Sequence, residues 1–277
     1  MKIKHINSFD KIKISYNIKR RSSKTMLVFL HGAGGNLQVW NKKRQILHKK
    51  NISTCAIDLR GHGSSERPKK ESSYDLSNFA KDIKCVLDFE KISDFILVGH
   101  CFGGMIAIKF AKLFPNTARS YILIDTTHKA PFILHTIFKT PKRFTKIFKD
   151  RLEKVVVCKD YNASTNYNKY VGTGDFNPFR ILEDIRNTTL KSWLFVYNNI
   201  AEFDGRSILK SIKQPVLIIS GNNDRIFSTK VAKEIHNLTK NSKYIEIPNA
   251  NHILVINNIK DVADAILQFV SERKLIK

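Results

Sequence analysis

The sequence is short of the residues and runs that would take it out of the ordinary globular class. It has only seven prolines and twelve glycines in 277 residues, and neither is gathered into a tract, so no disordered linker is expected. No apolar run approaches the roughly 18 residues of a membrane-spanning helix. The start, residues 1–6, mixes charged and apolar residues without the apolar core of a signal peptide. We therefore expect a soluble, cytoplasmic protein.

Cysteine is also scarce, at four residues without the spacing of a disulfide framework, as expected for reduced thiols in a reducing compartment. Acidic residues are half as frequent as basic ones, 24 against 48, which leaves a net charge of +24. Such a charge can attract an anionic partner. However, the lysines are spread along the chain among many Ile and Asn residues, and no helix-turn-helix, zinc-finger spacing or aromatic RNA-binding motif accompanies them. We predict no specific nucleic-acid partner.

Short apolar runs alternate with helical patterns along most of the chain. The runs lie at residues 26–30, 53–57, 95–98, 121–124, 216–219 and 244–247. This alternation predicts an α/β fold with a mostly parallel sheet flanked by helices. Residues 12–16 alternate at strand period and predict an antiparallel edge hairpin. Helical spacing follows Asp75 or Ser77, either of which is placed to cap, and a last helix is predicted over 262–270.

The alternation stops between residues 128 and 205. We therefore divide the chain into a first part of the core (1–127), a helical lid or cap insertion (128–205) and a second part of the core (206–277). Within the insertion an apolar stripe is flanked by basic residues on the other faces; the stripe comprises Phe144, Ile147, Phe148 and Leu152. A lid packed on the core is the favoured interpretation, and transient contact of this basic lid with a membrane surface is the alternative.

The run Gly99-His100-Cys101-Phe102-Gly103-Gly104 joins a strand pattern to a helical one. A nucleophilic side chain stands at the apex of a glycine-flanked turn, which is the pattern of a nucleophile elbow. The apex residue is forced into a strained backbone, and the glycines leave room for the turn and for a substrate. A lone Cys is more often a core filler, but this position is a poor one for a filler.

Three further segments follow strand patterns and carry the other groups that acyl transfer needs. Residues 30–35, Leu-His-Gly-Ala-Gly-Gly, place small residues where backbone N–H groups can approach an oxyanion. Asp224 follows the 216–219 run, and His252 follows the 244–247 run. Because parallel strands end at one edge of a sheet, all these groups can converge there. Alone, Asp224 could cap a helix and His252 could be an ordinary surface or core histidine.

The order nucleophile, acid, histidine, together with Asp-Leu-Arg-Gly-His-Gly-Ser-Ser at 58–65, resembles the α/β-hydrolase superfamily over essentially the whole chain. The resemblance implies Cys101 as nucleophile, His252 as general base and Asp224 as the carboxylate that orients it. It also implies an oxyanion hole formed by the backbone amides of Ala33 and Phe102.

In the same resemblance the 58–65 segment is a structural loop at the rim, so Asp58 and His62 are kept out of catalysis. Asp125 occupies the alternative acid position of some relatives and ranks below Asp224. The remaining histidines lack metal-ligand spacing, and the glycine run at 32–35 lacks a phosphate-loop or dinucleotide pattern. We predict no metal and no cofactor.

The chain departs from most members of this superfamily by having Cys101 where they have Ser. A native cysteine nucleophile is the first interpretation, because a helix N-terminus and a nearby imidazole both favour the thiolate. A similar Gly-x-Cys-x-Gly-Gly box occurs in dienelactone hydrolases and polyhydroxyalkanoate synthases, which differ in length or lack such a lid. The other interpretations are a laboratory Ser→Cys substitution and an inactive relative. Relatives with a nucleophilic aspartate are disfavoured.

These residues predict a hydrolase of carboxylic esters or thioesters that acts through a Cys101 acyl-enzyme. An acyltransferase on the same triad and a non-catalytic binding protein of this fold are the alternatives. The insertion is rich in apolar residues, which hints at an apolar acyl substrate. These residues are Phe132, Ile133, Leu134, Ile137, Phe138, Phe176, Phe179 and Trp193. Such residues also serve simply to pack lid helices. The acyl chain, the leaving group and the oligomeric state are left open.

Overall fold

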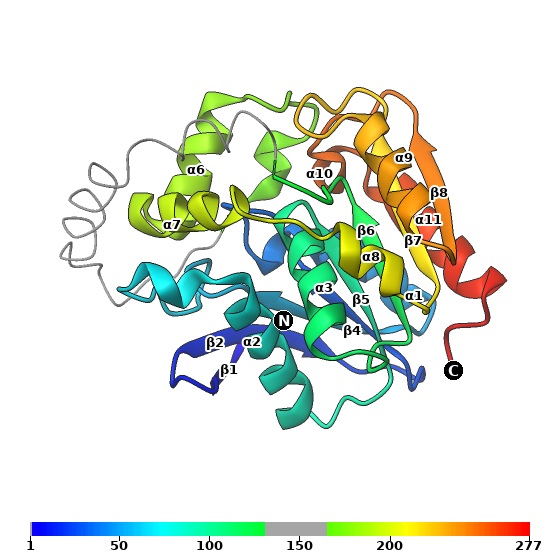
Figure 1. Cartoon of the computed structure of the whole chain (residues 1–277), viewed down its shortest axis with the longest axis horizontal. Helices are drawn as coiled ribbons and strands as arrows, with labels where there is room; N and C mark the ends of the chain where they lie inside the picture. Colours follow the sequence, from blue (N-terminus) through cyan, green and yellow to red (C-terminus); the bar gives the residue numbers. More distant parts are fainter. Residues whose placement is uncertain (1, 131–164) are drawn as a thin grey trace.

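The computed structural model describes residues 2–130 and 165–277. In these ranges eight strands form one sheet in the order β1-β2-β4-β3-β5-β6-β7-β8 (Figure 1). The strands are β1 Lys4–Asn7, β2 Lys13–Lys19, β3 Met26–Leu30, β4 Ser53–Asp58, β5 Phe95–His100, β6 Ser120–Ile124, β7 Val216–Gly221 and β8 Ser242–Ile247. β1 and β2 pair antiparallel, β2 pairs antiparallel with β4, and the other pairs are parallel. The predicted α/β fold and the edge hairpin are confirmed.

Helices cover both faces of this sheet. They are α1 Asn41–Lys49, α2 Leu76–Phe89, α3 Phe102–Leu113, α6 Pro178–Thr188, α7 Leu190–Ile200, α8 Arg206–Ser211, α9 Thr229–Leu238, α10 Leu254–Asn257 and α11 Ile259–Glu272, with 3-10 turns η1 Leu37–Trp40, η2 Glu71–Tyr74 and η3 Tyr167–Tyr170. The last helix is longer at both ends than the apolar pattern indicated. Asp75 caps α2 as predicted, its side chain accepting a hydrogen bond from the backbone N–H of Ser77.

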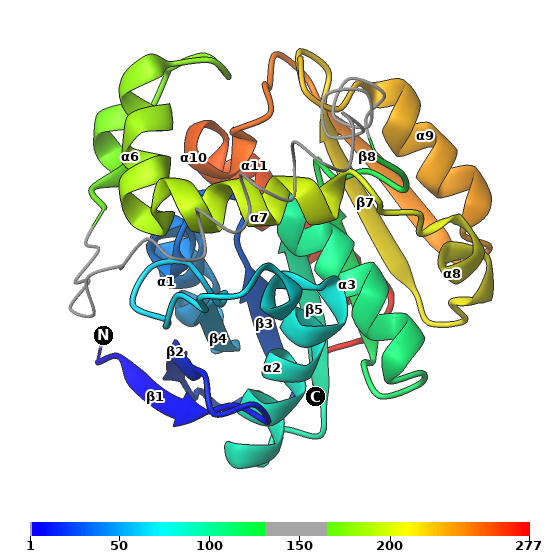
Figure 2. The same ribbon diagram turned by 60° about the vertical axis from the view of Figure 1, so that its left-hand side comes forward.

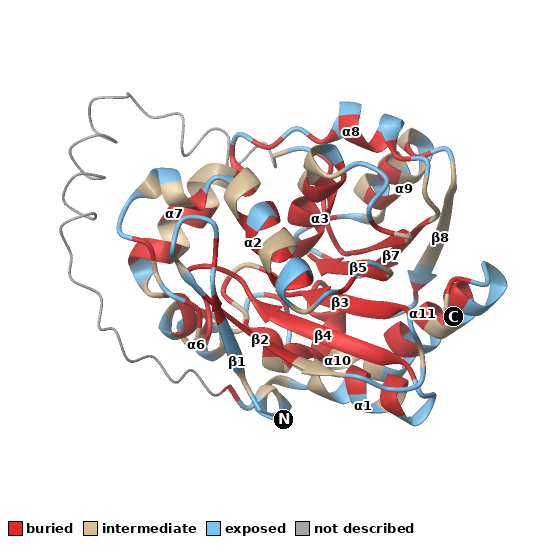
Figure 3. Cartoon of the chain, turned by 90° about the horizontal axis from the view of Figure 1, so that it is seen from below, coloured by how far each residue is buried: buried red, intermediate tan, exposed pale blue. Residues whose placement is uncertain are grey.

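The two faces of the sheet carry separate apolar clusters because side chains alternate along each strand. In β3, Val28 points to the cluster that α2, α3, α8 and α9 share, whereas Phe29 points to the cluster of α1, η1, α10 and α11. The central strands β3 to β7 are buried along their whole length, and the edge strands β1 and β8 are largely exposed or half-buried (Figure 3). Continuous apolar strands of this kind are typical of a parallel sheet covered on both sides.

Helices α6 and α7 lie across the edge at which the parallel strands end, and Figure 2 shows α7 crossing above β3 and β5. The contact is close, since a Cβ atom on Gly34 would lie 2.5 Å from Cβ of Asp184 in α6. Ser192 of α7 shares a 2.6 Å hydrogen bond with the Tyr74 hydroxyl. Residues 166–200 therefore cover the sheet edge, while the boundaries 1–127, 128–205 and 206–277 remain predictions.

Several predicted features fall on residues 131–164, which lie outside the described part of the chain. Among them are the apolar stripe of the insertion and most of its apolar residues. Within the ranges that the structure does describe, no helix combines the length and the apolar character needed to cross a membrane.

Candidate active site

Cys101 stands between β5 and α3 with φ 51° and ψ −116°. This is a strained conformation for a residue with a side chain, and four hydrogen bonds to the main chain of Cys101 hold it, one of them from the Met105 N–H (3.3 Å). The Cys101 N–H donates to the carbonyl of Ile124 at the end of β6 (3.0 Å). The Cys101 carbonyl accepts from the Gly104 N–H (2.9 Å) and from the Thr126 hydroxyl (2.7 Å). The side chain is thereby presented at the edge of the sheet.

Two glycines make this turn possible because other backbone atoms occupy the space of a side chain. A Cβ atom on Gly99 would lie 2.3 Å from the Gly103 carbonyl oxygen, and one on Gly103 would lie 2.4 Å from the Leu30 carbonyl oxygen. The glycines therefore allow the first turn of α3 to pack directly against β5 and β3.

Asp224 follows β7, and its carboxylate is completely buried. Its Oδ1 accepts hydrogen bonds from the N–H groups of Ile226 (2.7 Å) and Phe227 (2.8 Å), and its Oδ2 lies 2.9 Å from Nδ1 of His252. α9 begins only at Thr229 with Ser228 as its N-cap, so Asp224 does not cap that helix. Both oxygens of the Asp224 carboxylate are therefore taken up by hydrogen-bond donors.

His252 lies in the loop after β8 and is within hydrogen-bonding reach of Cys101 as well as Asp224. Burial alone would lower the pKa of His252. The nearby Cys101 sulfur and the hydrogen bond to Asp224 outweigh burial and raise this pKa well above its usual value. Because the Nδ1–H faces Asp224, the Nε2 atom is the one left for the thiol. The structure thus brings together Cys101, His252 and Asp224, which are far apart in the sequence.

Of the two amides predicted for the oxyanion hole, that of Phe102 directly follows Cys101, and that of Ala33 belongs to a loop that packs near Cys101. The N–H of Phe102 is the first of α3 and has no acceptor within the helix. Ala33 packs on the same apolar cluster as Cys101, and a Cβ atom on its neighbour Gly32 would lie 3.2 Å from Cβ of Cys101. The loop is fixed by the buried His31 side chain, which donates to the Gly32 carbonyl (2.8 Å) and accepts from the Leu59 N–H (3.1 Å).

Asp58 ends β4, His62 lies in the loop that follows it, and both side chains are bonded to backbone groups. Asp58 accepts from the N–H groups of Leu37 (2.7 Å) and Ser64 (2.9 Å), and His62 bonds to the Arg60 carbonyl (2.9 Å). These contacts are structural and agree with the expectation that both side chains stay out of catalysis.

The sequence did not single out two residues that lie beside the nucleophile. Nε2 of His100 donates to the carbonyl of His252 (2.9 Å) and so ties β5 to the histidine loop. Tyr197 of α7 lies close enough to Cys101 for the two side chains to interact electrostatically, and its ring packs on Trp193 (4.1 Å between centroids). The position of His100 directly before the nucleophile was a usable signal, whereas nothing in the sequence pointed to Tyr197.

Asp125, the lower-ranked acid, follows β6 and is also buried. Its Oδ1 accepts from the Gly221 N–H (2.9 Å), and its side chain faces that of Asp224. In the described residues, ligand atoms of His100, Asp125 and His252 lie within 4.8 Å of one another. Nδ1 of His252 is taken by Asp224 and Nε2 of His100 by the His252 carbonyl, so we assign no metal, and the absence of a metal stays a prediction.

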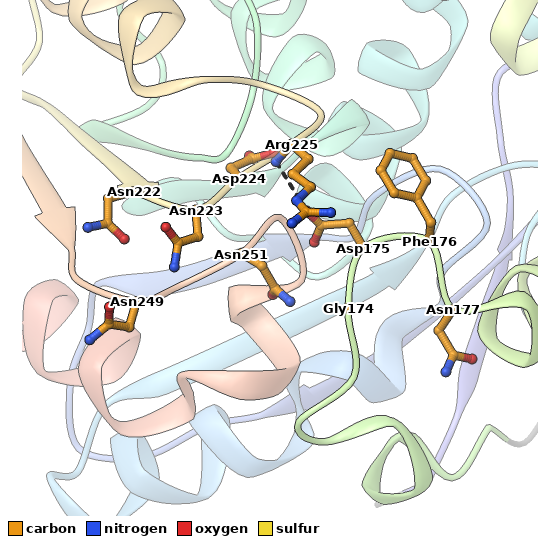
Figure 4. Close-up of a pocket in the computed structure, with 10 residues that line it drawn as sticks. All are labelled: Gly174, Asp175, Phe176, Asn177, Asn222, Asn223, Asp224, Arg225, Asn249 and Asn251. Carbon is orange, nitrogen blue, oxygen red and sulfur yellow. Dashed lines mark hydrogen bonds between the residues drawn. The ribbon is translucent and has the colours of Figure 1, made fainter.

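Beside the acid and histidine loops lies an open cavity of about 850 Å³ (Figure 4). It is lined by the loops after β7 and β8 and by the segment before α6, with Gly174, Asp175, Phe176, Asn177, Asn222, Asn223, Asp224, Arg225, Asn249 and Asn251. This lining is rich in amides, in contrast to the apolar surroundings expected for an acyl chain. Phe176 and Phe179, two of the apolar residues considered for that role, are 62% and 74% exposed.

Comparison with known proteins gives the family. The model of the α/β-hydrolase fold family matches residues 25–259. The chain belongs to this family. It is 23% identical over 246 residues to 2-(acetamidomethylene)succinate hydrolase of Mesorhizobium japonicum, covering 87% of this chain and 86% of the relative. It is 36% identical over 129 residues to 1-acylglycerol-3-phosphate O-acyltransferase of Pongo abelii, covering 44% of this chain and 35% of the relative.

Among solved structures, the enol-lactonase of Burkholderia xenovorans superposes with a TM-score of 0.74 at 18% identity, covering 97% of this chain and all of the lactonase. At this identity the likeness shows the fold alone. The family match and the hydrolase relatives confirm the prediction of an α/β-fold hydrolase.

Proposed function

We propose that the chain hydrolyses carboxylic esters or thioesters through an acyl group carried on Cys101, with His252 and Asp224 completing the triad. One observation carries the proposal: a buried imidazole is held at 2.9 Å by a buried carboxylate while its other side reaches the thiol at the elbow. A core-filling cysteine has no need of such partners, and a lost activity leaves no reason to keep both.

The chemistry follows from the geometry. His252 takes the thiol proton as the Cys101 sulfur attacks the acyl carbon. The amides of Phe102 and Ala33 stabilise the oxyanion that forms. Collapse breaks the bond to the leaving group, which takes the proton from His252. The imidazole then accepts a proton from water, whose hydroxide attacks the thioester and releases the acid.

An apolar acyl group is the proposed substrate class. Cys101, Ala33 and Tyr197 border the apolar cluster on one face of the sheet, so an acyl chain leaving the thiol in that direction meets apolar side chains. The amide-rich cavity on the other side suits the polar leaving group. Contact of the basic insertion with a membrane surface and a cytoplasmic location remain predictions.

Acyl transfer is the second candidate. A thioester is attacked by amines and thiols more readily than an oxygen ester is, so sulfur at the elbow favours transfer to an acceptor over hydrolysis. The partial match to an acyltransferase points the same way, over less than half of the chain.

The test combines kinetics with intact-protein mass spectrometry. Wild type, Cys101→Ala, Cys101→Ser and the control Cys85→Ser are incubated with p-nitrophenyl esters and acyl thioesters of increasing chain length, with and without amine or alcohol acceptors. Cys85 is a suitable control because it is a free, half-buried thiol of α2. We expect an acyl adduct on wild type and Cys85→Ser, and loss of adduct and turnover in Cys101→Ala.

Each outcome separates the candidates. Free acid as the only product in the presence of acceptors excludes transfer, and acylated acceptor as the main product excludes simple hydrolysis. Turnover in Cys101→Ala equal to wild type would overturn the nucleophile. An unmodified Cys101 after thiol reagents and every acyl donor supports the binding protein instead.

A further inference from the structure

The buried carboxyl groups of Asp125 and Asp224 face each other next to His252, and the proposed triad uses only Asp224. Asp125 is 2% exposed, and Asp224 has no exposed side-chain surface. Two carboxylates in contact inside a protein do not both ionise, because neither charge is solvated and each repels the other. One of the two groups must therefore hold a proton.

Their hydrogen bonds decide which one. Asp224 receives three donors, the N–H groups of Ile226 and Phe227 and the Nδ1–H of His252, so both of its oxygens act as acceptors. Asp125 receives one donor, the N–H of Gly221 at Oδ1 (2.9 Å). Its Oδ2 is buried and receives no hydrogen bond from any described residue. That oxygen is the place for the proton.

We propose that Asp125 is a protonated carboxylic acid that donates a hydrogen bond from Oδ2 to the Asp224 carboxylate, and that it is a positioning residue for the His252 orienting acid. The inference rests on the proposed function for its kinetic consequence but not for the protonation itself. Burial and the neighbouring Asp224 raise the pKa of Asp125 well above its usual value, while His252 opposes them. Other groups that face this pair are His100 and Tyr244.

The backbone around Asp125 links this pair to the nucleophile. Asp125 has φ 38°, and its own N–H donates to the Ile219 carbonyl of β7 (2.9 Å). The residues on either side, Ile124 and Thr126, bond to the backbone of Cys101. Residues 124–126 therefore hold Cys101 through its main chain and, in this proposal, hold Asp224 through the Asp125 side chain.

The protonation is tested on the resting protein without any substrate. Aspartate carboxyl carbons are labelled with ¹³C and followed by NMR across neutral pH, with Asp125→Asn used to assign the resonance. We expect the Asp125 carboxyl to keep the chemical shift of a protonated acid at neutral pH. A resonance at the shift of a carboxylate throughout that range would overturn the proposal, whether or not the chain is an enzyme.

The positioning role is tested by paired variants. In Asp125→Asn the amide N–H₂ replaces the O–H donor and the amide oxygen still accepts from Gly221, so kcat should stay within about threefold of wild type. Asp125→Ala removes the donor, so kcat should fall about ten- to a hundredfold with little change in KM, and the pH profile should shift. The Nδ1–H proton resonance of His252 should move in Asp125→Ala and less in Asp125→Asn.

Two results would contradict this role. Equal losses in Asp125→Asn and Asp125→Ala would show that the negative charge of Asp125 matters. An active Asp224→Asn variant that is inactivated by adding Asp125→Asn would make Asp125 a substitute acid. If Asp125→Ala does not fold, Asp125→Asn and the wild-type titration still decide. Failure of the proposed function itself would appear separately, as full turnover in Cys101→Ala.

Discussion

The sheet edge and the helices that cross it hold their polar groups in different ways. At the edge, strands and backbone N–H groups fix each group: Cys101 is bonded through its main chain, and Asp224 receives two N–H donors from its own loop. In α6 the buried carboxylate of Asp184 pairs instead with a side chain of the same helix, Arg180 (2.6 Å). Backbone groups of strands and loops therefore hold the candidate site residues at the edge, whereas Asp184 in α6 pairs with a side chain of its own helix.

The largest expected difference between the sheet edge and helices α6 and α7 is in kcat, when the buried carboxylates Asp224 and Asp184 are each replaced. Asp224→Asn should lower kcat about 10⁴-fold, because the amide no longer holds the reactive tautomer of His252. The matched variant Asp184→Asn also replaces a buried carboxylate and should change kcat less than about tenfold. Steady-state assays with one ester substrate measure both. A loss in Asp184→Asn comparable to that of Asp224→Asn would remove the distinction between edge and cover.

The next largest difference is expected in the free energy of unfolding, when a glycine at the sheet edge and one in the segment before α6 are each replaced by alanine. Gly99→Ala places a methyl group 2.3 Å from a backbone oxygen, so we expect a loss of more than about 4 kcal/mol in the free energy of unfolding. Gly174, in the segment before α6, has no atom within 4 Å of the added carbon. Gly174→Ala should stay within about 0.5 kcal/mol of wild type. Urea denaturation measures both, and equal losses would refute the comparison.

The stability of the protein should depend on pH through Asp184 of α6, one of the two helices that lie across the sheet edge. Burial raises the pKa of Asp184 to about 7, against the opposing charge of Arg180. Between about pH 4 and pH 7 the unfolded chain releases this proton and the folded chain keeps it. The stability of wild type should therefore fall, relative to Asp184→Asn, by roughly 2 to 4 kcal/mol as pH rises through this window, and the difference should be constant above it. A flat difference across the window would contradict the assignment.

The smallest effect is expected on the outer face of the cover. Phe179 of α6 is 74% exposed, so Phe179→Ser should change the free energy of unfolding by less than about 0.5 kcal/mol. Phe195 of α7 is 2% exposed and packs on Tyr74 with 5.5 Å between ring centroids. Phe195→Ala should cost about 3 to 5 kcal/mol. Thermal unfolding measures the pair, and a destabilised Phe179→Ser would show that this face is covered.

The fold was predictable because its signals are local. Apolar runs of four or five residues alternated with helical spacing, and the parallel sheet required them to end at one edge. Cys101, Asp224 and His252 could be named because each lies in the turn or loop that follows a strand. Tyr197 could not, since it reaches Cys101 only through the way α7 crosses the edge, which no local pattern encodes.

The meeting of Asp125 with Asp224 was hidden for a related reason. Both were weighed as alternatives for one position, because each follows a strand, and Asp224 was ranked higher for its spacing after Gly221. Strands β6 and β7 are neighbours in the sheet, so the two side chains are brought together rather than one replacing the other. Sequence order gives the candidates, and only the sheet order shows that both are present at once.

The hydrogen bonds that hold the elbow involve only the main chain of residue 101. Nothing in the turn therefore distinguishes sulfur from oxygen at its tip. Cysteine and serine codons are separated by a single nucleotide, so one mutational step can pass such a scaffold between thiol and alcohol chemistry without rebuilding it.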